Sequence, residues 1–335
     1  MKKIFTFLFV ALSLFSLSDK KISEIETKVQ QEGILHYSHP PKIIFVKREE
    51  LRRILQKDLG KESVVLKSLG IIDNEDSYIQ IKKELMLSNA VGFFDPENGD
   101  RIYLLQGLGE LEQEFALVHE LRHYIQFQTF PELFKVLKNS LFCEDSAITF
   151  TALLEGDANL LTLNYFGIKN FPMDFSLLKL PANKEGAFLK EIFSFIYGAG
   201  YRIIKKEYEK DGWSGVFKLL KNPPLYSSFF YSKPYSPPSC PCENPKVLGM
   251  KMYSFIFDDL AKGIQGDCFC LQRDFLEGRI LFKSSDKVAI ALKKISGKIK
   301  AIREERLIKF KVEVKDDSSY PGEKRNDPED RRGTL

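Results

Sequence analysis

Histidine is scarce in this chain, with 4 in 335 residues, and tryptophan occurs once. The net charge of +4 is slight for this length, and lysines are interspersed with acidic residues. This argues against the basic surface that nucleic-acid binding requires, so we expect no nucleic-acid partner. No internal repeat is visible. After the N-terminus, no segment has the roughly 20 apolar residues that span a bilayer, and the composition, 44% hydrophobic and 29% charged, is that of a globular protein.

The N-terminus combines two lysines, an apolar run over residues 4–17 and small residues before Asp19. This pattern is typical of a signal peptide, and we expect cleavage after Ser18. The run is shorter than a comfortable membrane span, and an uncleaved anchor is the alternative. Because no cysteine follows the run, nothing favours a lipid anchor. We therefore expect export to the periplasm or outside the cell, either without stable membrane insertion or tethered through an uncleaved N-terminus.

Cysteine is also sparse, and four of the five cysteines form two Cys-x-Cys pairs, Cys240 with Cys242 and Cys268 with Cys270. In an exported chain such pairs are expected to form two disulfides, although the pattern leaves the choice of partners open. Metal binding by the pairs is the alternative. Cys143 is left over and is expected to be a buried thiol.

Two of the four histidines lie in one stretch, ALVHELRHYIQFQ, at residues 116–128. On a helix, His119 and His123 share one face a turn apart, which suits two zinc ligands. Glu120 lies about 100° round the helix, within reach of a water molecule but poorly placed to bind the ion. The HExxH spacing therefore predicts two Zn²⁺ ligands and a general base. A surface helix with two chance histidines is the alternative.

A catalytic zinc site usually has three protein ligands, and no histidine follows His123. A carboxylate is therefore expected as the third ligand. The helix expected over residues 144–165 is heavily apolar, so a carboxylate within it is costly unless it is paired or binds a metal. This argument favours Glu155, with Glu144 at the start of the helix as the alternative ligand.

Two further polar residues of this helix, Asp157 and Asn159, are candidates for supporting a ligating imidazole by a hydrogen bond. A solvent-facing role is the alternative for either residue. Gly156 weakens a helix, and its presence suggests that something packs closely against the backbone there.

Residues 91–105 have the pattern of a β-hairpin that directly precedes the motif helix, with strands at 91–94 and 101–105 and turn residues between them. The motif helix is expected to begin near Glu110 and to end before Pro131. An exposed edge strand beside a metal-binding helix can hold an extended peptide by main-chain hydrogen bonds. A purely structural hairpin is the alternative.

These motifs resemble exported bacterial HExxH proteins of gluzincin type, a family of metallopeptidases in which the motif helix is followed by a helix containing EGDA. The resemblance runs from about residue 41 to residue 295. It rests on His119, Glu120, His123, Gln126, Gln128, Glu155, Gly156, Asp157 and Ala158, and on VGFFDP, Tyr197, Gly200, Gly212, Trp213, Pro223 and Pro224. It implies a zinc site that hydrolyses peptide bonds.

One position departs from the pattern of that family. After the double proline, such proteins have a serine or threonine pair and then a histidine before a proline, whereas Tyr231 lies near that place here. A phenol can also donate a hydrogen bond to a developing oxyanion, so Tyr231 or Tyr201 is a candidate for this role. An ordinary loop aromatic is the alternative for Tyr231.

We expect an α+β, zincin-like fold, in which a small mixed sheet with an edge hairpin packs on the HExxH helix and a second ligand-bearing helix. The expected parts are a signal peptide (1–18), an N-terminal α/β part of the catalytic domain (19–90), a zincin-like catalytic core (91–235), a disulfide-stapled α/β extension (236–314) and a disordered charged tail (315–335). The expected activity is that of a zinc metallopeptidase with a peptide or protein substrate. The alternatives are a non-catalytic exported binding protein with the same scaffold and a zinc hydrolase of non-peptide amides.

Overall fold

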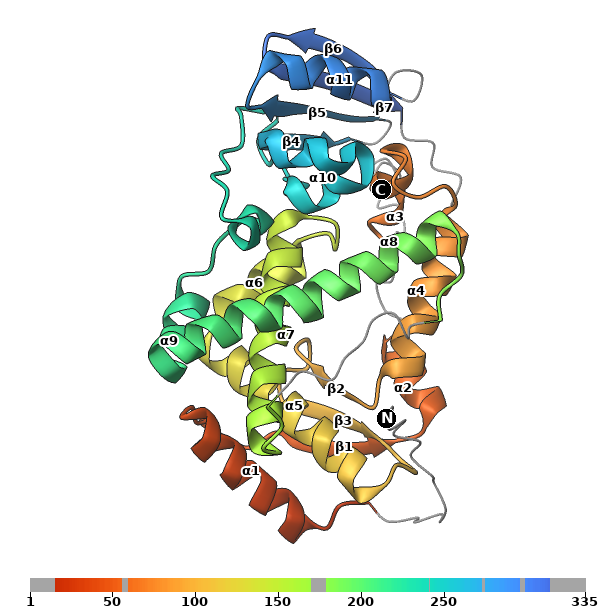
Figure 1. Ribbon diagram of the computed structural model, residues 1–335. Coiled ribbons are helices and arrows are strands. Elements are labelled where there is room, and N and C mark those ends of the chain that lie inside the picture. The colour runs from red at the N-terminus through yellow and green to blue at the C-terminus, as the bar shows by residue number, and fades with distance from the viewer. Residues whose placement is uncertain are drawn as a thin grey trace, which may run out of the picture.

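The computed structural model describes residues 16–55, 60–169, 179–240, 242–272, 275–295 and 299–313. The predictions for the signal peptide (residues 1–15 of it) and for the charged tail lie outside these residues. The described chain is α+β and elongated, with one small sheet near each end and the helices α7, α8 and α9 between them (Figure 1). The α+β class expected from the sequence is thereby confirmed.

The N-terminal and central part carries most of the helices. Its elements are α1 (Asp19–Gly33), β1 (Lys42–Val46), α2 (Arg48–Leu55), α3 (Ser63–Ser68), α4 (Glu75–Asn89), β2 (Gly92–Asp95), β3 (Arg101–Leu105), α5 (Glu110–Thr129), α6 (Pro131–Asn139), α7 (Asp145–Tyr165), α8 (Lys184–Phe193), the π-helical turn η2 (Ser194–Ala199), α9 (Gly200–Lys221) and the 3-10 turn η3 (Ser227–Tyr231). The C-terminal part consists of α10 (Gly249–Phe257), the 3-10 turn η4 (Asp258–Gly263), β4 (Ile264–Leu271), β5 (Phe275–Phe282), α11 (Ser285–Ile295), β6 (Lys300–Glu304) and β7 (Leu307–Glu313).

The first sheet has the strand order β1-β3-β2, with β1 parallel and β2 antiparallel to the central strand β3. Strand β2 is therefore an edge strand of this sheet, and it packs against α5. Apolar side chains of the hairpin and of the helix share one core, in which Phe94, Leu104 and Leu117 are buried. The predicted hairpin and its position beside the motif helix are confirmed.

The motif helix α5 begins at Glu110 and ends at Thr129, as expected. The Glu112 carboxylate caps the N-terminus of this helix by accepting the Gly109 N–H at 3.0 Å. Phe130 and the following Pro131 end it, because a proline can begin the next helix but cannot continue this one.

Helices α7 and α9 approach each other closely through glycine. A Cβ atom on Gly156 would lie 2.5 Å from the Gly200 carbonyl oxygen, and one on Gly200 would lie 1.9 Å from the Ala152 carbonyl oxygen. No side chain fits at either position, which explains Gly156 and confirms that a backbone packs against it. This contact brings the segment before Gly200 to Glu155.

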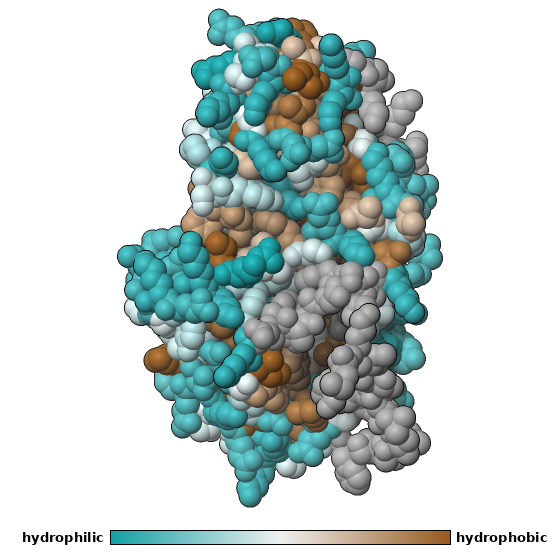
Figure 2. All heavy atoms as spheres, viewed as in Figure 1, coloured by the Kyte–Doolittle hydropathy of each residue, from teal (hydrophilic) through white to brown (hydrophobic). Residues whose placement is uncertain are grey.

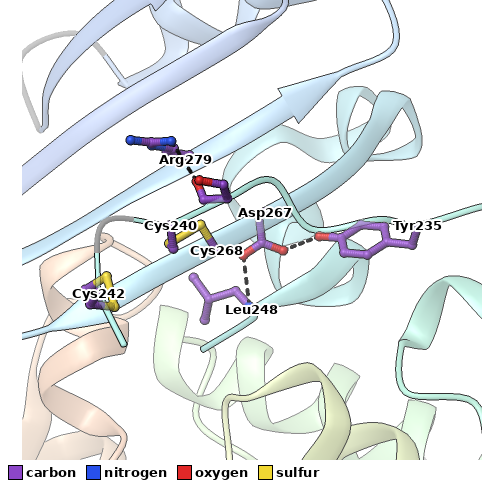
Figure 3. The surroundings of a disulfide bond; sticks show 9 residues. Tyr235, Cys240, Cys242, Leu248, Asp267, Cys268 and Arg279 are labelled. Carbon is purple, nitrogen blue, oxygen red and sulfur yellow. Dashed lines mark hydrogen bonds between the residues drawn. A yellow bond between two sulfur atoms is a disulfide. The ribbon is translucent and has the colours of Figure 1, made fainter. Parts of the chain in front are cut away.

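The second sheet is antiparallel throughout, with the order β4-β5-β7-β6 and α11 packed against it. Two disulfides, Cys240–Cys268 and Cys242–Cys270, fix the incoming chain to β4 (Figure 3). The predicted disulfides are thus confirmed with this pairing, and Cys143 is a buried free thiol, also as predicted. Beside them, Asp267 accepts the Leu248 and Gly249 N–H groups at 3.0 Å each and caps α10.

The described chain begins inside the folded structure. Leu17 is 6% exposed, and its N–H donates to the buried Gln113 Oε1 at 3.0 Å. Ser18 caps α1 by accepting the Lys21 N–H. Cleavage after Ser18 would remove both interactions. Within the described residues, no helix has the length and apolar character needed to cross a membrane.

Candidate metal centre

Three side chains from α5 and α7 converge on one point. His119 Nε2 lies 3.0 Å from His123 Nε2, and Glu155 Oε2 lies 3.3 Å from the first and 3.6 Å from the second. Among the described residues, His119, His123 and Glu155 form a group whose ligand atoms lie close enough together to hold a metal ion. The structure therefore places the three predicted ligands together.

The spacing of these atoms fits a zinc ion. A tetrahedral site with ligand bonds of about 2.0–2.1 Å places its ligand atoms about 3.3 Å apart, which the three observed distances bracket. Glu155 Oε2 is buried without a hydrogen-bond partner among the described residues, and such an atom is costly to bury unless something binds it. Two imidazoles and a carboxylate are also a common donor set for zinc.

The electrostatics of the cluster favour a cation. Burial lowers the pKa of His123, but the carboxylates of Glu155 and Glu120 outweigh burial and raise this pKa to about 9. Burial raises the pKa of Glu155, but the two imidazoles outweigh it and hold this pKa below its ordinary range. In the metal-free chain the site therefore carries a proton at neutral pH, in the place where a metal ion would supply the positive charge.

Gln126 determines which nitrogen of the neutral His123 imidazole carries the proton. Its Nε2 donates to the Leu154 carbonyl at 2.9 Å and to Asp157 Oδ2 at 2.7 Å, so its amide orientation is fixed. Its Oε1, 2.8 Å from His123 Nδ1, must then accept the Nδ1–H. In the neutral imidazole, Nε2 consequently carries the lone pair that a metal requires.

Asp157 supports the imidazole through Gln126 and makes no direct contact with it. Its carboxylate pairs in a bidentate manner with Arg122, at 2.7 Å and 2.8 Å. Both side chains are fully buried, and the guanidinium lies over the Trp213 ring, 4.7 Å from its centre. Buried polar networks whose groups are all satisfied are rigid, so the series of contacts from Trp213 through Arg122 and Asp157 to Gln126 supports the His123 imidazole firmly.

The sequence also suggested Asn159 and Glu144 as site residues. Asn159 is 6% exposed and lies one turn after Glu155, and its Nδ2 lacks a hydrogen-bond partner among the described residues. Glu144 precedes α7, where it accepts the Leu141 N–H at 2.6 Å and pairs with Lys246. The structure thus groups Glu155, and not Glu144, with the histidines.

Glu120 points toward the edge strand. Its Oε2 accepts the Phe94 N–H at 2.8 Å, so β2 fixes the position of this carboxylate. Gly92, two residues earlier on β2, leaves room for it, because a Cβ there would lie 2.9 Å from Glu120 Cγ. The general base proposed from the sequence therefore lies between the metal-binding cluster and the hairpin.

Tyr197 is a site residue whose role no local sequence pattern indicates. Burial together with the nearby Glu155 and Glu120 carboxylates raises the pKa of its phenol well above the ordinary value. It lies in η2, the π-helical turn, where the extra residue per turn rotates side chains away from the faces expected for an α-helix. The resemblance that included Tyr197 was the one signal for it.

The two tyrosines suggested by the sequence lie on η3 and α9. Tyr231, at the end of η3, lines a cavity of about 340 Å³ with Glu191 and Lys251. Burial and the carboxylates of Glu191 and Asp145 raise its pKa to about 12. Tyr201 is buried in α9, with Lys205 near its ring. An oxyanion role for either tyrosine stays a prediction.

Comparison with protein-family models, with curated proteins and with solved structures found no match to this chain.

Proposed function

We propose that this chain is an exported, zinc-dependent metallopeptidase with a zincin-like catalytic core. The observation that carries the proposal is the convergence of His119, His123 and Glu155 beside a Glu120 carboxylate that is held separately on the edge strand. A protein that needed zinc only for folding would have no use for a carboxylate in this place. The disulfides of the C-terminal part support export, because such bonds persist in oxidising compartments.

The site residues would have separate roles in peptide hydrolysis. His119, His123 and Glu155 would hold the ion, which when bound supplies a Lewis acid that polarises a carbonyl and acidifies water. Glu120 accepts the proton of the attacking water and passes it to the leaving amine. Tyr197 and Gln126 keep Glu155 and His123 in the orientations that ligation requires.

Strand β2 offers a place for an extended substrate. Leu105 N–H donates to the Val91 carbonyl, so the main-chain groups of Val91 and Phe93 face β3, and those of Gly92 and Phe94 point to the open edge. A peptide added to this edge would run past Glu120, which already contacts the Phe94 N–H. The substrate we propose is therefore a peptide or protein segment in extended conformation.

Metal analysis together with a protease assay tests this function. The purified protein should contain one zinc per chain and cleave casein, and a chelator should abolish cleavage until zinc is restored. Cleavage of small amides without cleavage of casein would indicate a hydrolase of non-peptide amides. Bound zinc without hydrolysis of either would instead support the non-catalytic binding protein.

A further inference from the structure

We propose that Phe115 and Phe166 form an apolar subsite that receives a large apolar side chain of the peptide substrate, within a few residues of the scissile bond. This proposal rests on the proposed peptidase function and assigns it a class of substrate.

The two rings make an aromatic surface that is partly open to solvent, because Phe115 is exposed and Phe166 is half-buried. They are stacked with their centroids 5.5 Å apart and their planes at 20°. Phe115 is 38% exposed, and the exposed Leu111 lies one turn before it on α5. Ile168, just beyond Phe166, is also 38% exposed. Large apolar side chains that are clustered and exposed in this way are typical of binding surfaces.

Both rings lie on the helix faces that carry the metal-binding side chains. Phe115 precedes His119 by four residues, which places the two about 40° apart around α5 and about 6 Å apart along it. Phe166 is the C-cap residue of α7 and follows Glu155 by eleven residues, close to three full turns, so it lies toward the Glu155 face about 16 Å further along the helix. The aromatic pair therefore continues the face of the metal centre on both helices.

The position of the aromatic pair beside the metal-binding cluster indicates that a side chain of the bound peptide would occupy it. The edge of β2 lies on the Glu120 side of α5, and the aromatic pair lies on the α7 side, with His119 between them. A peptide bound along β2 would project alternate side chains across the face of α5. Stacked aromatic rings give a large apolar side chain a large contact area, and they give a small side chain little.

The molecular face shown in Figure 2 carries several separate apolar patches among largely hydrophilic surroundings. Exposed apolar residues on the C-terminal part, such as Ile290 on α11 (49% exposed), provide a control that lies on an element without metal-binding residues.

The test measures binding and cleavage separately. Peptides that differ in one residue near the cleaved bond, phenylalanine or leucine against alanine, are titrated by calorimetry into zinc-loaded Glu120→Gln protein and digested by the wild type. We expect the apolar peptides to bind and to be cleaved about tenfold better than the alanine peptide. Phe115→Ser and Phe166→Ser should remove this preference and leave zinc content unchanged. Phe115→Leu should retain most of it, and Ile290→Ser should have no effect.

Several outcomes would overturn the subsite. An unchanged preference in both serine variants is the most direct of them. A lower thermal stability of these variants with unchanged preference would mean that the chain itself covers the rings. If the wild type cleaves no peptide but Glu120→Gln protein shows the Phe115-dependent binding, the peptidase function fails and the subsite survives as part of a peptide-binding protein. If neither binding nor cleavage depends on the apolar residue, the subsite proposal is wrong and the peptidase proposal is unaffected.

Discussion

Gln126 Oε1 lies 2.8 Å from His123 Nδ1, and the other end of the same amide is bound to Asp157 and to the Leu154 carbonyl. An amide that is fixed at its nitrogen can only accept a hydrogen bond at its oxygen. This relationship gives His123 one tautomer and turns its Nε2 toward His119 and Glu155. Gln126 thus orients a side chain of the candidate metal site, although Gln126 itself would not contact the ion.

Gln126→Leu should therefore weaken zinc binding. Leucine cannot accept the Nδ1–H, so the imidazole loses its fixed tautomer and orientation, and loss of such a support typically lowers metal affinity by about 10–100-fold. Chelator competition measures this change. Gln128→Leu, on the same helix but bonded to Ser38 and Tyr124, should keep the wild-type affinity. Equal affinities of the two variants would show that Gln126 does not set the ligand.

A matched pair of variants distinguishes Glu155 from Glu144 as the third metal ligand. Glu155→Ala should lose zinc and should no longer be stabilised by added zinc, because a ligand stabilises only the state that binds it. Glu144→Ala removes the ion pair with Lys246 and should lower the melting temperature while zinc content stays at one per chain. If Glu144→Ala is metal-free and Glu155→Ala is loaded, the assignment of Glu155 is wrong.

Gly92 should matter for turnover and not for metal content. In Gly92→Ala the new Cβ would lie 2.9 Å from Glu120 Cγ and 3.2 Å from Leu104 Cδ2, so the general base must move. We expect kcat to fall about tenfold or more at unchanged zinc stoichiometry, since small displacements of a catalytic group are costly. At Gly109, the nearest atom to an added Cβ is 3.6 Å away, so Gly109→Ala should retain wild-type kcat. Wild-type turnover of Gly92→Ala would contradict the placement of Glu120.

Zinc affinity should rise with pH in the range below about 9. The pKa of His123 is raised to about 9 in the metal-free chain, so at pH 7 this imidazole carries a proton that metal binding must displace. Glu155, whose pKa is lowered, is already ionised there. Affinity should therefore increase up to about tenfold per pH unit from pH 6 to 8 and level off above 9. Calorimetry in buffers of different ionisation enthalpy should detect about one released proton at pH 7, and binding without proton release would contradict this picture.

Much of the candidate metal site was predictable because its signals are local. The spacing of His119 and His123 fixes a shared helix face, and the cost of burying Glu155 in an apolar helix indicates a cationic partner. The hairpin and the limits of α5 followed from turn and capping residues in the same way. The two disulfides were expected from the Cys-x-Cys pattern, but their pairing depends on the register of β4 with the incoming chain, which no local pattern contains.

The unpredicted part depends on contacts between distant segments. The π-helical turn that aims Tyr197 at Glu155 changes the helical period, and so the 3.6-residue pattern gives the wrong face there. Asp157 was expected to support an imidazole directly, but Arg122 occupies its carboxylate and Gln126 lies between it and His123. Both arrangements depend on how α5, α7 and α9 cross, and the Gly156–Gly200 contact that sets this crossing joins residues 44 positions apart (200 − 156 = 44).

The most direct test of the account compares wild type with Glu120→Gln for zinc content and hydrolysis of casein. Glutamine keeps the shape of the side chain but cannot take up the proton of water. The account predicts one zinc per chain in both proteins, casein cleavage by the wild type, and cleavage at least about 100-fold slower in the variant. Cleavage by Glu120→Gln within a few-fold of wild type, or a wild type that binds zinc and hydrolyses nothing, would contradict it.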